Sequence, residues 1–186
     1  MLARIVLRVG LPAVVLAVLL TIGLTAQTRA SSEHDRVVAA PSVALATGDD
    51  RQLVRAADAV FVGRVDTVGP VHMVGGTPYT NFDIAVIDVM KGSMAGQVTL
   101  AQLGGIIPGR HERVIVSGDS PLETGNVYLF SAQRSAAVDA LVVVPGHGHI
   151  DLTDDVLNPR ALTAESARTI PRVALMRSVM DLRPHD

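Results

Sequence analysis

Two histidines and an aspartate alternate late in the chain, at His147, His149 and Asp151. On a β-strand, alternate residues point to the same face, so these side chains would lie about 6–7 Å apart. Two imidazoles at that separation can ligate one zinc ion, and Asp151 is a further ligand of suitable type. His111 and Glu112 are the other candidates for a third ligand. The spacing therefore predicts a zinc site if the backbone is extended through this segment.

The residues around the histidines favour a second interpretation. Pro145, Gly146 and Gly148 interrupt the segment, and prolines and glycines are typical of turns. In an exposed turn the histidines would be solvated and the protein would need no cofactor. Both interpretations stay open: a protein without a cofactor, or a small zinc-binding protein or metal-dependent hydrolase that uses His147 and His149.

The Gly-Asp-Ser sequence at residues 118–120 resembles the nucleophile segment of a group of esterases, with Asp181 and His185 as the remaining members of a triad. The rest of the chain does not fit that group. Only 66 of the 186 residues follow Ser120, too few for an α/β sheet with its crossover helices. Asp181 and His185 are also four residues apart, whereas those enzymes have them three apart. A Gly-Asp-Ser-Pro turn explains the stretch, so we predict no catalytic residue and no enzyme activity.

The first thirty residues have the pattern of an export signal. Arg4 and Arg8 precede an uncharged apolar run of about 18 residues, and the small residues Thr28 and Ala30 suit cleavage after Ala30. We expect residues 1–30 to be a signal peptide, or a signal anchor if uncleaved, because the run is close to the shortest that crosses a bilayer. The protein is then secreted or anchored at the outer face of the cytoplasmic membrane, and meets the membrane only through this segment.

Composition narrows the choice of partner. The chain has no cysteine, so disulfides are excluded and the domain depends on its apolar core. Residues 1–30 contain three of the 16 basic residues and none of the 18 acidic ones, which leaves the remainder with a formal charge of −5. Two tyrosines, three phenylalanines and no tryptophan give few stacking groups for nucleic acid. We exclude nucleic acid and expect a protein or glycan of the cell envelope.

Short strands and turns alternate over most of the chain. Residues 31–48 are small, polar and without period, which predicts a flexible linker, and a short helix is expected from Asp49. Strands are expected at residues 59–68, 79–92, 97–103, 114–116, 127–131 and 141–144. The apolar parity changes between Val86 and Ile87, which requires a bulge or a bend.

The last part of the chain returns to a helical period, with Ile170, Val173 and Met176 on one side and Pro171 in a first helical turn. The whole pattern predicts a mainly β (α+β) fold. We expect a β-barrel domain over residues 49–160 and a C-terminal helical segment over residues 161–186.

Three segments resemble a group of exported, largely uncharacterised bacterial domains: "ADAVFVGRV" at residues 57–65, "FDIAVIDVMKG" at 82–92 and "LETGNVYLF" at 122–130. The resemblance implies a small closed antiparallel OB-like β-barrel, similar to netrin and metalloproteinase-inhibitor domains. Inhibitory members act through an N-terminal cysteine, and this chain has none, so their mechanism is not carried over. The matched Lys91 is expected in a turn, and Tyr128 is expected to serve in packing.

Overall fold

The computed structural model describes residues 34–38, 49–110 and 112–181. The chain divides into two units, residues 1–32 and 33–186, and all described residues belong to the second. The predicted export signal lies outside the described residues. Within those ranges, no helix is long and apolar enough to cross a membrane.

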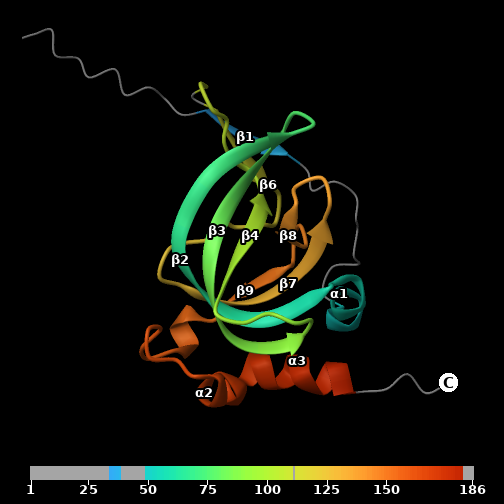
Figure 1. The fold of residues 1–186 in the computed structure, drawn as a ribbon, viewed down its shortest axis with the longest axis vertical. Coiled ribbons are helices and arrows are strands. Elements are labelled where there is room, and N and C mark those ends of the chain that lie inside the picture. The colour runs from blue at the N-terminus through green and yellow to red at the C-terminus, as the bar shows by residue number, and fades with distance from the viewer. Residues whose placement is uncertain (1–33, 39–48, 111, 182–186) are drawn as a thin grey trace, which may run out of the picture. The chain divides into compact units, whose positions relative to one another are not determined.

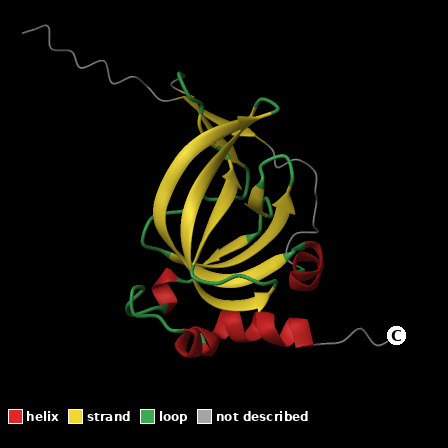
Figure 2. Ribbon diagram, in the orientation of Figure 1, coloured by secondary structure: helices red, strands yellow, loops and turns green. Residues whose placement is uncertain are grey.

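The fold is mainly β, as the sequence predicts (Figures 1 and 2). The strands in the described ranges are β1 (His34–Val38), β2 (Ala59–Val74), β3 (Thr77–Lys91), β4 (Gln97–Leu103), β5 (Gly105–Ile106), β6 (Glu112–Val116), β7 (Val127–Ser135), β8 (Ala140–Val143) and β9 (His149–Asp151). The helices there are α1 (Asp50–Ala56), α2 (Ala164–Thr169) and α3 (Pro171–Asp181), with a 3-10 helix η1 (Thr153–Asp155). Pro171 begins α3, which confirms its predicted place in a first helical turn.

Hydrogen bonds run in a ring through five strands, in the order β2, β3, β4, β8, β7 and back to β2. Four of these pairs are antiparallel, but β4 and β8 are parallel, so the prediction that all pairs are antiparallel is wrong at this one. The chain leaves β4, forms β5, β6 and β7, and only then returns along the free edge of β4 as β8. A strand that returns after an intervening hairpin can run in either direction, which local sequence does not specify.

The predicted bulge in β3 is confirmed at the residue where the parity changes. Val62 pairs with Asp88 and Gly63 pairs with Val86, so Ile87 is the extra residue on β3. The bulge changes which parity faces the interior of the ring. As a result Val86 before it and Val89 after it both pack against the interior cluster, whereas Ile87 packs against the cluster under the helices.

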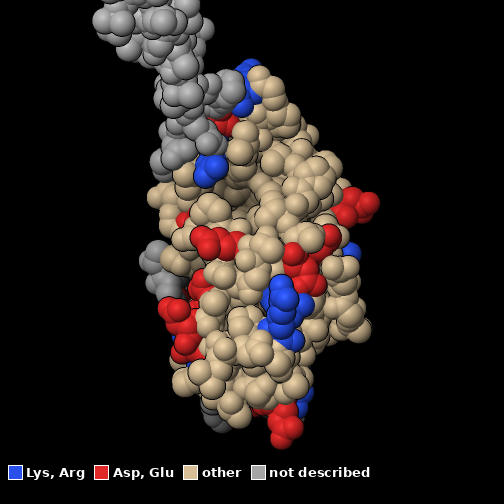
Figure 3. All heavy atoms as spheres, turned by 90° about the vertical axis from the view of Figure 1, so that its left-hand side faces the viewer, with Lys and Arg blue, Asp and Glu red and all other residues tan. Residues whose placement is uncertain are grey.

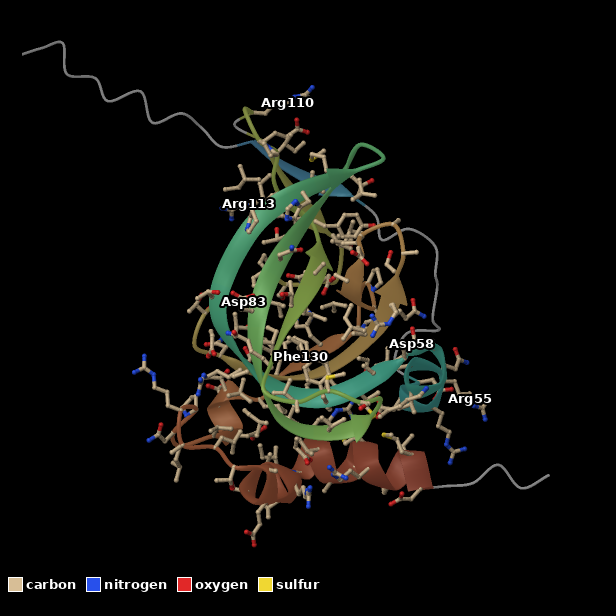
Figure 4. The ribbon with its side chains drawn as sticks, in the orientation of Figure 1. Arg55, Asp58, Asp83, Arg110, Arg113 and Phe130 are labelled. Atoms are coloured by element: carbon tan, nitrogen blue, oxygen red, sulfur yellow. The ribbon has the colours of Figure 1, made fainter. Side chains whose placement is uncertain are left out.

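Two apolar clusters share the strands β2 and β7. The first fills the interior of the ring and contains Phe61, Phe82, Leu100 and Phe130; Figure 4 shows Phe130 among the strands. The second lies on the opposite face of the same two strands, under the C-terminal helices. Its fully buried members include Val60, Val62, Val127, Leu129, Ala167, Val173 and Met176. The helices therefore cover the outer face of β2 over its first half, at Val60 and Val62.

Lys91 has a more specific role than a turn residue. Its Nζ donates to the carbonyl oxygens of Val54 and Ala57, at 2.8 and 2.5 Å, at the end of α1. Those carbonyls have no partner within the helix, and a cation there also opposes the negative end of the helix dipole. Gly92 follows with φ of 89°, a conformation that favours glycine. The lysine–glycine pair thus both ends β3 and fixes α1.

Part of the segment predicted as a flexible linker forms a strand. The backbone of β1 pairs in parallel with β6, from His34 opposite Glu112 to Val38 opposite Val116. The edge of β6 offers unpaired backbone groups, and an extended β-branched segment can occupy it. The other residues of the linker lie outside the described ranges.

Candidate functional site

Two segments singled out in the sequence, which are far apart along the chain, line one pocket of about 420 Å³. One is the turn after β6, and the other is the glycine-rich connection from β8 into β9. Between them lies the start of β7. The lining residues are Gly118, Ser120, Pro121, Glu123, Asn126, Tyr128, Gly146, His147, His149 and Asp151. Among these, Pro121 is the only apolar side chain other than the ring of Tyr128.

The turn after β6 is held against β4 by a single glutamine. Gln102 Nε2 donates to the carbonyl oxygen of Ser120 at 2.8 Å and to Asp119 Oδ1 at 3.3 Å, and its Oε1 accepts from Leu122 N at 3.1 Å. Gly118, with φ of 78°, allows the reversal. The turn therefore presents Ser120 to solvent while it buries Asp119.

The glycine-rich connection does not form the extended segment that the zinc hypothesis needs. His147 lies in a turn and is exposed, and β9 begins only at His149, so the extended backbone on which the zinc interpretation depends is not present at His147. Gly148 is the physical reason. It donates to Val144 O at 2.8 Å and its own carbonyl accepts from Ser131 N, in a space where a Cβ would collide with Val144.

The predicted metal ligands His147, His149 and Asp151 line the same pocket, but in the described structure they do not form a set that could hold a metal ion. Within the described residues, no group of three or more histidine, aspartate or glutamate side chains could hold a metal ion. Glu112 begins β6 and does not line this pocket, and His111 lies outside the described residues. Asp151 lies on β9 but faces Asn126 and accepts from Thr153 N at 2.8 Å.

His149, at the floor of the pocket, forms a buried pair with Asp119 behind it. Nδ1 of His149 lies 3.0 Å from Oδ1 of Asp119, with 9% and 1% of the two side chains exposed. The distance is that of an ion pair, yet Nδ1 has no hydrogen bond of acceptable direction, and Asp119 Oδ2 has no partner at all among the described groups. We therefore regard the pair as a close polar contact in which His149 Nδ1 and Asp119 Oδ2 each lack a hydrogen bond. Buried polar atoms without a hydrogen bond are uncommon.

Tyr128 completes the floor. Its ring meets that of His149 edge-on, with centroids 5.6 Å apart, and its hydroxyl oxygen accepts from Glu123 N at 3.1 Å and from Asn126 Nδ2 at 3.4 Å. Burial raises the pKa of the Tyr128 hydroxyl; the two hydrogen bonds oppose the effect, and the carboxylates of Asp151 and Glu123 add to it. The hydroxyl thus keeps its proton, for which the described residues supply no acceptor.

The pocket therefore has a buried floor and a polar rim. Tyr128 and His149 form the floor, with Asp119 behind His149, and we use "rim" below for the exposed side chains of Ser120, Glu123, His147 and Asp151. The sequence drew attention to Ser120, His147, His149 and Asp151. It did not suggest Gln102 or the site role of Tyr128, although a glutamine within the apolar run "TLAQL" is a signal of a buried polar contact.

The remaining members of the proposed esterase triad do not contribute. Asp181 ends α3 and does not line the pocket, and His185 lies outside the described residues. Ser120 makes no side-chain hydrogen bond to His149 in the described part of the chain.

A second hollow of about 190 Å³ lies on the other side of Asp119, lined mainly by apolar residues of β3, β4 and β6. Figure 3 shows acidic and basic side chains interspersed on one face of the described residues, without a continuous basic stripe.

Comparison with known proteins gives no relative from which a function could be transferred: no family model and no curated protein matches the chain.

Proposed function

We propose that the chain is an exported, non-catalytic interaction domain with an OB-like β-barrel, and that the polar pocket is its binding site. The export pattern of residues 1–30 supports a place in the cell envelope or the extracellular medium. The ring of hydrogen bonds through five strands supports the barrel, because the OB shape is a five-stranded Greek-key barrel. The partner is a protein or glycan of the envelope.

The observation that carries the proposal is the unused bonding capacity at the floor of the pocket. The Tyr128 hydroxyl lines the pocket and has no acceptor for its proton among the described residues, and the buried His149 Nδ1 and the Asp119 Oδ2 behind it also lack a hydrogen-bond partner there. Leaving such a group unsatisfied costs about 1–3 kcal/mol, and a ligand that supplies the partner recovers that cost. Small-ligand sites are concave, and a few convergent polar groups give them their orientation and specificity.

Binding is favoured over catalysis by the arrangement of the same residues. A serine nucleophile requires a base within hydrogen-bonding reach and a group that orients the base. Asp119 could orient His149, but Ser120 lies at the exposed rim without a bond to it. We therefore assign Ser120 to ligand contact.

The test uses a substitution that fills the pocket. Envelope extract is separated into a protein fraction and a polysaccharide fraction, and the binding of each to the immobilised full chain is measured by biolayer interferometry. Ser120→Trp should abolish binding of the active fraction, because the indole would occupy the pocket. Ser178→Trp, at an equally exposed serine on α3, is the matched control and should bind as the unaltered chain does. Full binding by Ser120→Trp would show that the pocket is not the site.

A further inference from the structure

We propose that the polar pocket takes a neutral, polyhydroxylated ligand, namely a segment of an uncharged glycan. This inference rests on the proposed function and names the ligand class for its site. It follows from three properties of the pocket, which are the free donor at its floor, the acceptors at its rim and the absence of a fixed positive charge among its lining residues.

The floor requires a ligand that can accept a hydrogen bond. The Tyr128 hydroxyl already accepts two hydrogen bonds, so its only remaining capacity is to donate. The raised pKa keeps that proton in place at neutral pH. The residue is 3% exposed and lines the pocket, so a ligand group that enters the pocket can supply the acceptor in place of water. An ammonium group has no lone pair and cannot serve.

The rim requires a ligand that can donate hydrogen bonds. The Glu123 carboxylate is exposed and makes no side-chain hydrogen bond to another described residue, and Asp151 Oδ2 accepts only a long bond of 3.3 Å from Asn126. Ionised carboxylates are acceptors only, and they bind donors more strongly than neutral acceptors do. Hydroxyl groups both donate and accept, so a sugar satisfies the rim and the floor together.

An anionic ligand does not fit this set of charges. The lining residues include the carboxylates of Glu123 and Asp151, with that of Asp119 behind them, but no lysine or arginine. A phosphate or carboxylate would face these groups without a permanent cation to offset the repulsion. The pocket thus selects against charged glycans of the uronic acid type.

A peptide is the other neutral ligand with both donors and acceptors. Recognition of an extended peptide relies on an exposed strand edge together with apolar pockets for alternate side chains. Here the only strand that ends the sheet beside the pocket is β9, which has three residues, and among the described lining residues Pro121 is the only aliphatic side chain. The lining favours a ligand that is polar on every side.

The experiment compares three trisaccharide classes of similar size on the full chain, by isothermal titration calorimetry. The neutral probes are N-acetylated chitotriose, maltotriose and cellotriose. The cationic probe is the fully deacetylated chitotriose, and the anionic probe is trigalacturonate. We expect at least one neutral probe to bind more tightly than either charged probe. Binding of none of the three neutral probes, or a preference for a charged one, would overturn the inference.

Two substitutions test whether Tyr128 and Glu123 contribute to that binding. Tyr128→Phe removes the free donor and Glu123→Gln weakens an acceptor, and each should weaken binding of the neutral probe by roughly three- to tenfold. Glu165→Gln, at an exposed glutamate in the first turn of α2, is the control and should leave binding unchanged. Circular dichroism checks that each variant is folded. Unchanged binding by both pocket variants would contradict the assignment.

The outcomes separate this inference from the proposed function. If Ser120→Trp loses the envelope ligand while every neutral probe fails, the pocket is the binding site and only the ligand class is wrong. If Ser120→Trp binds the envelope fraction normally, the proposed site and its ligand class both fail.

Discussion

At the scale of single residues, Tyr128 links the site to the stability of the fold. Burial raises the pKa of its hydroxyl above the ordinary value of about 10, so the folded state holds this proton more tightly than the unfolded state does. The corresponding stability is fully present below the ordinary pKa and is lost as the pH rises through the higher, folded-state value.

We therefore expect the free energy of unfolding to fall as the pH is raised above about 10, with a smaller fall in Tyr128→Phe. Urea unfolding at a series of pH values measures this. The chain has two tyrosines, so Tyr79→Phe leaves Tyr128 as the only phenol and its ionisation can be followed by ultraviolet absorbance. A midpoint for Tyr128 at or below the ordinary tyrosine value in the folded protein would contradict the prediction.

The histidines give a second prediction at the residue scale. Because His147 lies in a turn and His149 packs against Asp119, we expect the full chain, purified without a histidine tag, to bind less than about a tenth of an equivalent of zinc. Atomic emission measures the metal. Changing both His147 and His149 to alanine should leave the value as it is. Stoichiometric zinc that disappears in the double variant would restore the metal hypothesis.

At the scale of elements, a buried aspartate joins β3 to the C-terminal helices. Asp88 accepts from Arg168 Nε and Nη2 at 3.2 and 3.0 Å, and also from Arg177 Nη2. Its side chain is 2% exposed, whereas those of Arg168 and Arg177 are 56% and 32% exposed, so solvent reduces the strength of the pairing. The hydrogen bonds to Asp88 raise the pKa of Arg168, which stays charged at all ordinary pH values.

We expect Asp88→Ala to lower the free energy of unfolding by about 1–3 kcal/mol, because two arginines lose their buried acceptor. Asp83→Ala is the matched control on the same strand, since Asp83 is only partly buried and bonds mainly to the Thr67 hydroxyl. Its effect should stay below about 1 kcal/mol. Urea unfolding measures the free energy of unfolding of both variants. Equal decreases in the two would show that the burial of Asp88 does not add to stability.

The contact of Lys91 with α1 leads to a similar prediction about stability. It is the only lysine in the chain, and its ammonium is bonded to two carbonyls, so it should react slowly with an acetylating reagent while the chain is folded. Lys91→Met should reduce stability by about 1–2 kcal/mol through the loss of those bonds. Peptide mass spectrometry measures the acetylation, and thermal unfolding measures the stability. Rapid acetylation in the folded chain would mean that the contact with α1 is not kept in solution.

Some elements could be predicted from sequence because their determinants are local. The change of parity at Ile87 required a bulge, and a bulge is present there. The parallel pairing of Leu100 with Leu141 could not be predicted, because it depends on the order in which separate strands join the sheet. The pocket likewise depends on how separate segments of the chain come together in the fold. Asp119 and His149 were each visible in the sequence, but only the placement of the turn after β6 beside β9 makes them a pair.

At the scale of the whole described domain, the C-terminal helices and the strands share one of the two apolar clusters. The predicted boundary after residue 160 follows a real change of period, yet apolar contacts cross it. Ala167, Val173 and Met176 are fully buried against Val60 and Leu129 on the outer faces of β2 and β7. Removing the helices would expose that face of the sheet to water.

We therefore expect a chain that ends after Arg160 to lose cooperative unfolding and to bind a hydrophobic dye, because burial contributes roughly 1.5–3 kcal/mol for each large apolar side chain. A chain that ends after Asp181 keeps α3 and is the control; it should unfold as the complete chain does. Differential scanning calorimetry and dye fluorescence compare the three. If the chain that ends after Arg160 unfolds cooperatively near the temperature of the control and binds no dye, the strands form an independent domain and the helices are an appendage. In that case Asp88→Ala should also have lost little of its free energy of unfolding, because Asp88 joins the strands to the helices. The two measurements therefore test one another.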